Sequence, residues 1–134
     1  MANTILCIED NPHNMLLLKR ILQAYGYNML EAETGLDGIR LAEEEAIDLL
    51  LLDINLPDID GYEVIQRLRK HAKTELNTLP IVVLSANALR GDDEKALSAG
   101  CNLYLTKPID LQALKEALRQ FLPVADDDDD DDLF

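Results

Sequence analysis

The stretch LLLLDINLPDIDG, residues 49–61, contains the feature on which the interpretation of this sequence depends. Four consecutive leucines are typical of a strand that is buried on both faces of a sheet. The run ends at Asp53, and a buried carboxylate without a partner costs several kcal/mol or takes up a proton. Asp53 therefore either marks the point where the strand reaches water, or it has neighbours that require a carboxylate there.

The rest of the chain alternates between short apolar runs and segments of helical periodicity. Strands are predicted at residues 4–9, 28–32, 48–53, 80–85 and 102–106. Helices are predicted at about 12–25 and 36–45, around Val64–Leu68, between Gly91 and Gly100, and from Leu111 to Leu122. Asn11 is the expected cap of the first helix, with Pro12 at its first position. Five strands alternating with five helices predict an α/β fold with a parallel sheet covered on both faces.

Composition limits both the architecture and the possible partners. The 134 residues suit one domain, residues 1–123, followed by an acidic tail, residues 124–134, that is expected to be disordered. The formal charge is −14, and no basic patch with interleaved aromatics argues for direct nucleic-acid binding. No apolar run approaches the ~18 residues of a membrane span. No leader sequence opens the chain, so the cytoplasm is the expected location.

Several residues that often carry chemistry are given structural roles here. Cys7 and Cys101 fit no zinc spacing and are expected to be buried thiols. His13 and His71 are expected on exposed helix positions without a clustered partner. The acidic residues of the Asp58–Asp60 segment are interpreted as turn formers.

Polar residues gather where the predicted strands end. Glu9 and Asp10 follow the first strand, Asp53 ends the third, Ser85 ends the fourth, and Lys107 follows the fifth. The carboxyl ends of parallel strands share one edge of a sheet, so these groups are expected to meet there.

Such a cluster needs a counter-charge. Two carboxylates ~5 Å apart repel by roughly 3 kcal/mol at an effective dielectric near 20. A Mg²⁺ ion, which prefers carboxylates, waters and phosphate oxygens, relieves this repulsion. Asp53 can then act as a carboxylate nucleophile that accepts a phosphoryl group, with Lys107 and Ser85 donating to the phosphoryl oxygens.

Four short motifs together carry a family resemblance. IEDN (residues 8–11), DINLPDIDG (53–61), LSA (84–86) and LTKP (105–108) resemble the receiver domain of two-component response regulators, over residues 4–122. The resemblance implies a flavodoxin-like, doubly wound (βα)5 three-layer sandwich with sheet order 2-1-3-4-5. It also implies Mg²⁺-dependent phosphorylation by a sensor histidine kinase or a histidine phosphotransfer protein.

The resemblance also assigns roles to individual residues. It implies the following: Asp53 is the phosphoacceptor, Glu9 and Asp10 are the acidic pair with Asp10 the more direct metal ligand, Asn55 offers its backbone carbonyl to the metal, Lys107 precedes a cis Pro108, and Ser85 and Tyr104 are the switch hydroxyl and switch aromatic. Two departures are mild, because Glu9 stands where Asp is common and Ser85 replaces the commoner threonine.

The sequence is therefore interpreted as a stand-alone receiver, a monomer or weak dimer that acts on a downstream protein effector. It is a signalling module and not a turnover enzyme. A phosphohydrolase with an aspartyl intermediate needs a second acid where Asn55 stands. A nucleotide-binding flavodoxin-like protein needs a glycine-rich or hydroxyl-rich phosphate loop after the first strand, and the EDNPHN segment is neither. The remaining alternative is a degenerate receiver that serves as a constitutive interaction module.

Overall fold

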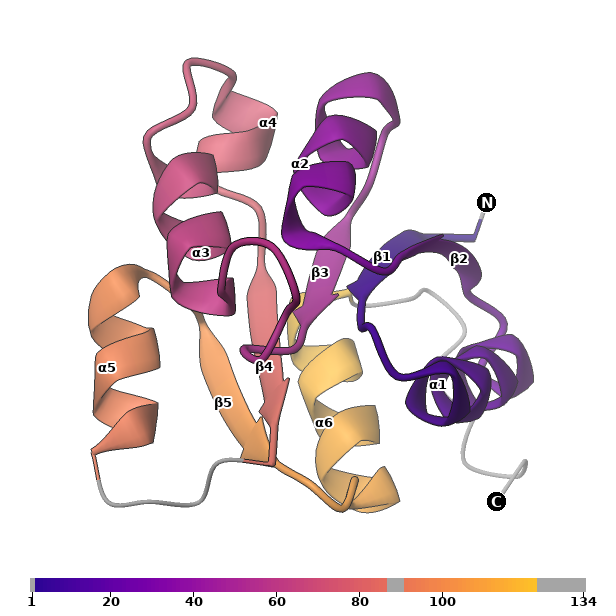
Figure 1. Ribbon diagram of the computed structural model, residues 1–134. Helices are drawn as coiled ribbons and strands as arrows, with labels where there is room; N and C mark the ends of the chain where they lie inside the picture. The colour runs from indigo at the N-terminus through magenta and orange to yellow at the C-terminus, as the bar shows by residue number, and fades with distance from the viewer. Residues whose placement is uncertain (1, 87–90, 123–134) are drawn as a thin grey trace.

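The computed structural model describes residues 2–86 and 91–122, in which five parallel strands form one sheet. The strands are β1 (Thr4–Ile8), β2 (Asn28–Ala32), β3 (Leu49–Leu52), β4 (Ile81–Ser85) and β5 (Leu103–Thr106), in the order β2-β1-β3-β4-β5 (Figure 1). The predicted parallel sheet and its order are therefore confirmed.

The leucine run forms the middle of the sheet, as its composition predicts. Each residue of β3 is 1% exposed or less. Leu50 and Leu52 pack into the core on one face, whereas Leu49 and Leu51 pack into the core on the other. This alternation follows from the two-residue period of a strand and requires helices on both faces.

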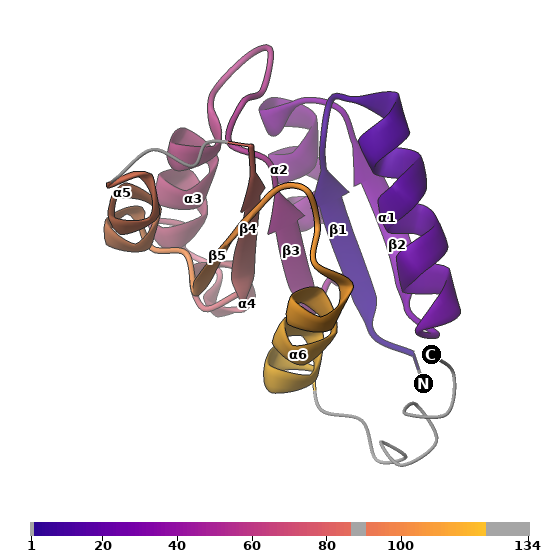
Figure 2. The same cartoon turned by 90° about the horizontal axis from the view of Figure 1, so that it is seen from below.

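Helices cover both faces of the sheet and make three layers (Figures 1 and 2). The first face carries α2 (Gly35–Glu44), α3 (Gly61–Arg69), α4 (Thr74–Asn77) and α5 (Asp92–Ala99), whose buried residues share one apolar cluster. The second face carries α1 (Pro12–Ala24) and α6 (Leu111–Phe121). Asn11 caps α1 as predicted, since its Oδ1 accepts hydrogen bonds from the backbone N–H of His13 at 2.9 Å and of Asn14 at 3.1 Å.

The prediction of one helix after each strand misses α4, a single turn before β4. Four residues are too few to show a helical period, so no sequence pattern indicated this turn. Leu76 anchors it in the core at 3% exposure, and Thr78 Oγ1 donates to the carbonyl of Thr74 at 2.7 Å.

The expectation for His71 is also wrong. This residue follows the end of α3 and is only partly exposed, and its Nε2 lies 2.8 Å from Glu43 Oε2. The partner is 28 residues away in sequence, which is why the local pattern gave no sign of it. His13 does lie exposed on α1, and Cys7 and Cys101 are buried free thiols, as predicted.

Within the two described segments, no helix has both the length and the apolar character needed to cross a membrane. The predicted acidic tail, residues 124–134, lies outside the described residues.

Candidate functional site

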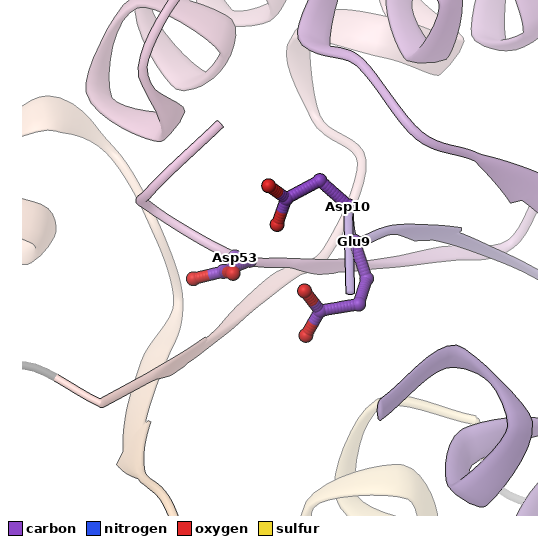
Figure 3. Close-up of side chains that lie close together, drawn as sticks. All are labelled: Glu9, Asp10 and Asp53. Carbon is purple, nitrogen blue, oxygen red and sulfur yellow. The ribbon is translucent and has the colours of Figure 1, made fainter. Parts of the chain in front are cut away.

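The polar residues predicted to meet do lie together at the carboxyl edge of the sheet. Glu9 follows β1 and Asp53 follows β3, and these two strands are neighbours in which Ile8 pairs with Leu52. Figure 3 shows the side chains of Glu9, Asp10 and Asp53 converging on one space. One carboxylate oxygen from each of the three residues lies within 4.8 Å of the other two. Asp53 therefore does not simply mark where the strand reaches water, because two acidic side chains lie beside it.

Backbone hydrogen bonds hold the strand ends that carry these groups. The N–H of Glu9 donates to the carbonyl of Ala32 at 3.0 Å, and the N–H of Asp53 donates to that of Ile8, also at 3.0 Å. The N–H of Lys107 donates to the carbonyl of Ser85 at 2.7 Å. Sheet hydrogen bonding therefore fixes the starting point of each functional side chain.

Lys107 reaches the acidic cluster, but its closer partner is Glu9. Its Nζ donates to Glu9 Oε1 at 2.6 Å and lies 3.6 Å from Asp53 Oδ2. Lys107 therefore forms ion pairs with both carboxylates, and the shorter one is with Glu9. Glu9 has a longer side chain than Asp53 and can reach the ammonium. It is also 3% exposed, so its buried carboxylate is strongly stabilised by the positive charge of Lys107. The peptide bond between Lys107 and Pro108 is cis, as the resemblance implied.

The cluster divides its charge unequally. Burial, followed by the charge of Glu9, raises the pKa of Asp53 from 3.8 to about 6, and the Lys107 ammonium only partly offsets these effects. For Glu9, burial favours the protonated form, but hydrogen bonds from Lys107 and from the N–H of Asn11 outweigh burial and lower the pKa. Glu9 is therefore the more readily ionised of the two carboxylates, and the charge of Asp53 is only partly compensated by Lys107.

The segment after Asp53 also belongs to the site. The N–H of Asn55 donates to Asp53 Oδ1 at 3.2 Å, which places Asn55 beside the cluster. Gly61 closes the segment, since its N–H donates to the carbonyl of Ile54 at 2.8 Å. A Cβ at Gly61 would lie 2.7 Å from Ile54 Cα, so only glycine fits this close approach.

Ser85 and Tyr104 lie on adjacent strands, as predicted. Ser85 pairs with Thr106, and Val83 pairs with Tyr104. Residues two apart on a strand point to the same side, so Ser85 and Tyr104 both face the layer of α3 and α5. Ser85 is fully buried, whereas Tyr104 is partly buried against that core cluster.

One residue of the site region was assigned too small a role from the sequence. Asp58 forms no mere turn, because its carboxylate accepts hydrogen bonds from the backbone N–H groups of Gly35 and Leu36. These partners lie 23 and 22 residues earlier in the chain, so no short-range pattern could have indicated them.

The donor set is suited to a hard divalent cation. Three carboxylates converge, and the single ammonium is committed mainly to Glu9. The oxygens of Asp10 and Asp53 therefore keep a net negative charge, and Mg²⁺ is typically bound by one or two carboxylates with waters completing its octahedron.

Comparison with known proteins identifies a family in which such an acidic site is expected. Residues 5–119 match the family model of the response regulator receiver domain, and the chain therefore belongs to this family. It is a receiver domain of two-component signalling. It is 34% identical over 122 residues to the polar-differentiation response regulator DivK of Brucella ovis, a match that covers 91% of this chain and 98% of DivK.

Solved structures give the same result. The receiver domain of the sensor histidine kinase PA1611 from Pseudomonas aeruginosa, which holds a magnesium ion in its active-site cleft, has a TM-score of 0.83 and 35% identity. That match covers 92% of this chain and all of the other. A second similar structure is the complex of the Ssk1 receiver domain from Saccharomyces cerevisiae with the histidine phosphotransfer protein Ypd1. The match has a TM-score of 0.80 and 27% identity, and it covers 93% of this chain and 94% of the other.

Proposed function

We propose that this chain is a response regulator receiver that accepts a phosphoryl group on Asp53 and then changes its binding to a partner protein. The observation that carries the proposal is the convergence of Glu9, Asp10 and Asp53 within 4.8 Å, with the Lys107 ammonium 3.6 Å from Asp53. This arrangement supplies a carboxylate nucleophile, a place for a divalent cation and a donor for a phosphoryl oxygen.

The phosphoryl donor is a phosphohistidine on a sensor histidine kinase or on a histidine phosphotransfer protein. The complex of Ypd1 with the Ssk1 receiver supports this class of partner. In the transfer, a phosphorus–oxygen bond to Asp53 forms while the phosphorus–nitrogen bond breaks, and the electron pair stays on the imidazole nitrogen. The attacking carboxylate must be ionised, and a pKa of about 6 leaves Asp53 mostly ionised at neutral pH.

Mg²⁺ is the proposed cofactor, held by Asp10 and Asp53, by Glu9 in support, and by the backbone carbonyl of Asn55. The magnesium in the Pseudomonas aeruginosa receiver supports this assignment. When bound, the ion neutralises the charge that develops on the phosphoryl oxygens.

Lys107 and Ser85 convert the modification into a signal. Lys107 contacts a phosphoryl oxygen, and the Ser85 hydroxyl moves toward another, which leaves space for the Tyr104 ring. The surface that changes is formed by α5, β5 and α6, residues 91–122. Shifting this surface from 1:99 to 99:1 requires about 5.5 kcal/mol of differential binding. One hydrogen bond contributes about 1 kcal/mol, so Lys107, the metal and the partner must share the rest.

The module works in the cytoplasm as a monomer or weak dimer. Its output passes to a downstream protein effector, or the phosphoryl group passes onward to a histidine phosphotransfer protein. In either case Asp53 is modified and later regenerated, so the chain takes part in the chemistry of its own phosphorylation without turning over a separate substrate.

Incubation with acetyl phosphate and Mg²⁺, followed by intact mass spectrometry, tests the proposal. The expected result is the gain of one phosphoryl group, which is lost with EDTA and in Asp53→Asn and is strongly reduced in Asp10→Ala. Ser85→Ala and Tyr104→Ala are expected to remain able to accept the phosphoryl group and to bind a phospho-specific partner more weakly. Full phosphorylation of Asp53→Asn would contradict the assignment, and no phosphorylation of the wild type would leave the degenerate receiver as the better description.

A further inference from the structure

The segment that joins Asp53 to α3 is attached to a second element, the start of α2. Asp58 Oδ1 accepts a hydrogen bond from the N–H of Gly35, and Asp58 Oδ2 accepts one from the N–H of Leu36, each at 2.8 Å. Both oxygens of one carboxylate are thus used by two consecutive amides of another element. Hydrogen bonds to an ionised acceptor are about twice as strong as neutral ones, and the N-terminus of a helix favours a negative charge.

Apolar packing reinforces this attachment. A Cβ on Gly35 would lie 2.7 Å from Ile59 Cγ1 and 3.2 Å from the carbonyl oxygen of Ile59. Glycine at position 35 therefore lets the helix start approach the residue next to Asp58. At position 35 the first turn of α2 therefore lies against Ile59 with no room for a side chain between them.

The same buried face of α2, one turn further along, packs on the strand that leads to the acidic pair. A Cβ on Gly38 would lie 2.6 Å from Ile8 Cγ1, so α2 packs directly on β1 one residue before Glu9. Ile8 is 1% exposed and cannot easily move. The start of α2 is therefore a rigid reference point for both halves of the carboxylate cluster.

We propose that Asp58 is a positioning residue that sets the distance between the segment after Asp53 and the acidic pair Glu9 and Asp10. The proposal rests on the proposed function, since the purpose of that distance is Mg²⁺ binding and phosphoryl transfer. The bridge runs from Asp58 through the first turn of α2 to Ile8. Mutating a residue that holds metal ligands in position, without binding the metal itself, commonly lowers metal affinity by tenfold or more.

Asp58 acts through position and not as a metal ligand. Its two oxygens are occupied by the α2 amides, and the acidic cluster found among residues 2–86 and 91–122 consists of Glu9, Asp10 and Asp53. Partial desolvation opposes ionisation of Asp58, but the hydrogen bonds from Leu36 and Gly35 lower its pKa, so the charged form of this bridge persists at neutral pH.

The competing explanation is that Asp58 only caps α2, and the chain offers a matched control for it. Thr34 is the N-cap residue of α2 itself, and its Oγ1 accepts a hydrogen bond from the N–H of Asp37 at 3.1 Å. Thr34→Ala therefore weakens the start of α2 without touching the segment 54–60. Asp58→Ala weakens the same helix start and also releases that segment.

The first measurement uses metal-free protein and NMR amide shifts. Asp58→Ala is expected to move the amide signals of Asp53 and Asn55, whereas Thr34→Ala moves only those at the start of α2. The second measurement is Mg²⁺ titration by calorimetry, in which Asp58→Ala is expected to bind about tenfold more weakly than Thr34→Ala. Asp58→Asn keeps one acceptor oxygen and is expected to fall between wild type and Asp58→Ala; it replaces the alanine variant in both measurements if that variant does not fold.

The outcomes separate this inference from the proposed function. If wild type binds no Mg²⁺ and accepts no phosphoryl group, the proposed function fails, and the metal-free shifts still decide the role of Asp58. If wild type binds Mg²⁺ but the Asp58 variants match Thr34→Ala in affinity and in amide shifts, Asp58 is a helix cap and the positioning role is overturned.

Discussion

Asp53→Asn is expected to make the metal-free protein more stable, although it removes the proposed phosphoacceptor. Asp53 is 8% exposed and lies beside Glu9, so its ionised form is in an unfavourable place. Asparagine has nearly the same shape and carries no charge. It keeps an oxygen that can accept the hydrogen bond from the N–H of Asn55. The substitution therefore removes a charge penalty and leaves the packing largely intact.

The size of the effect follows from the pKa of Asp53, which burial and Glu9 raise from 3.8 to about 6. Each pKa unit corresponds to about 1.4 kcal/mol, so ionised Asp53 lowers the free energy of unfolding by about 3 kcal/mol. Because the folded-state pKa is the raised one, the folded protein binds the proton more tightly than the unfolded chain does. The penalty is therefore small below pH ~4, grows as the pH rises through the window from about 4 to 6, and is complete above it.

Urea unfolding in EDTA measures this difference directly. At pH 7.5, Asp53→Asn is expected to gain up to about 3 kcal/mol over wild type, and at pH 5.0 about half of that. Asp10→Asn is the matched control, because Asp10 is exposed and water screens its charge, so its gain stays below about 1 kcal/mol. Added Mg²⁺ reverses the order by stabilising wild type much more than Asp53→Asn.

Two results would refute this reasoning. If Asp53→Asn is no more stable than wild type at pH 7.5, Lys107 already compensates the Asp53 charge from its distance of 3.6 Å. If the gain is the same at pH 5.0 and pH 7.5, it does not arise from ionisation of Asp53.

Three further changes have defined expectations. Lys107→Ala leaves the buried carboxylate of Glu9 without its 2.6 Å partner and should lower the free energy of unfolding in urea by about 3 kcal/mol. The variant should keep most Mg²⁺ binding but lose phosphorylation-dependent partner binding. Normal partner binding would contradict the coupling role of Lys107. Gly61→Ala places a Cβ within 2.8 Å of backbone atoms of residues 53–54 and should cost about 2 kcal/mol and weaken Mg²⁺ binding, with an unchanged calorimetric titration as the contrary result. Deleting residues 126–134 should change stability by less than about 0.5 kcal/mol and leave phosphorylation unchanged, since seven like charges bury no apolar surface; a large fall in melting temperature would show that the tail packs on the domain.

The sequence allowed the sheet and the residues at its edge to be predicted because each signal is local. Four leucines in succession require burial on both faces, and the residue that ends such a strand lies at the carboxyl edge whatever the rest of the chain does. Asp53 could therefore be placed at the site from the stretch that contains it. The parallel arrangement then brought Glu9 and Lys107 to the same edge.

The contacts made within that edge could not be predicted in the same way. Lys107 and Glu9 are 98 residues apart, and their choice of each other depends on side-chain length and burial. The bond of Asp58 to the start of α2 and that of His71 to Glu43 have the same character. In each case the sequence of a segment determines whether it forms a helix, strand or turn. Which distant side chain it contacts depends on how the helices pack on the sheet.

The unequal charge distribution bears on how metal and phosphoryl group would act together. Lys107 lies 2.6 Å from Glu9 and 3.6 Å from Asp53, so the charge of the proposed phosphoacceptor is less well compensated than that of Glu9. A phosphoryl group on Asp53 would add negative charge there and would attract the Lys107 ammonium away from Glu9. Glu9 is 3% exposed and cannot be left without a partner except at a cost of several kcal/mol. Lys107 can therefore change partners only when another cation lies close to Glu9, and the converging oxygens of Asp10 and Asp53 provide the place for one. On this reasoning Mg²⁺ is needed for the response to phosphorylation as well as for phosphorylation itself.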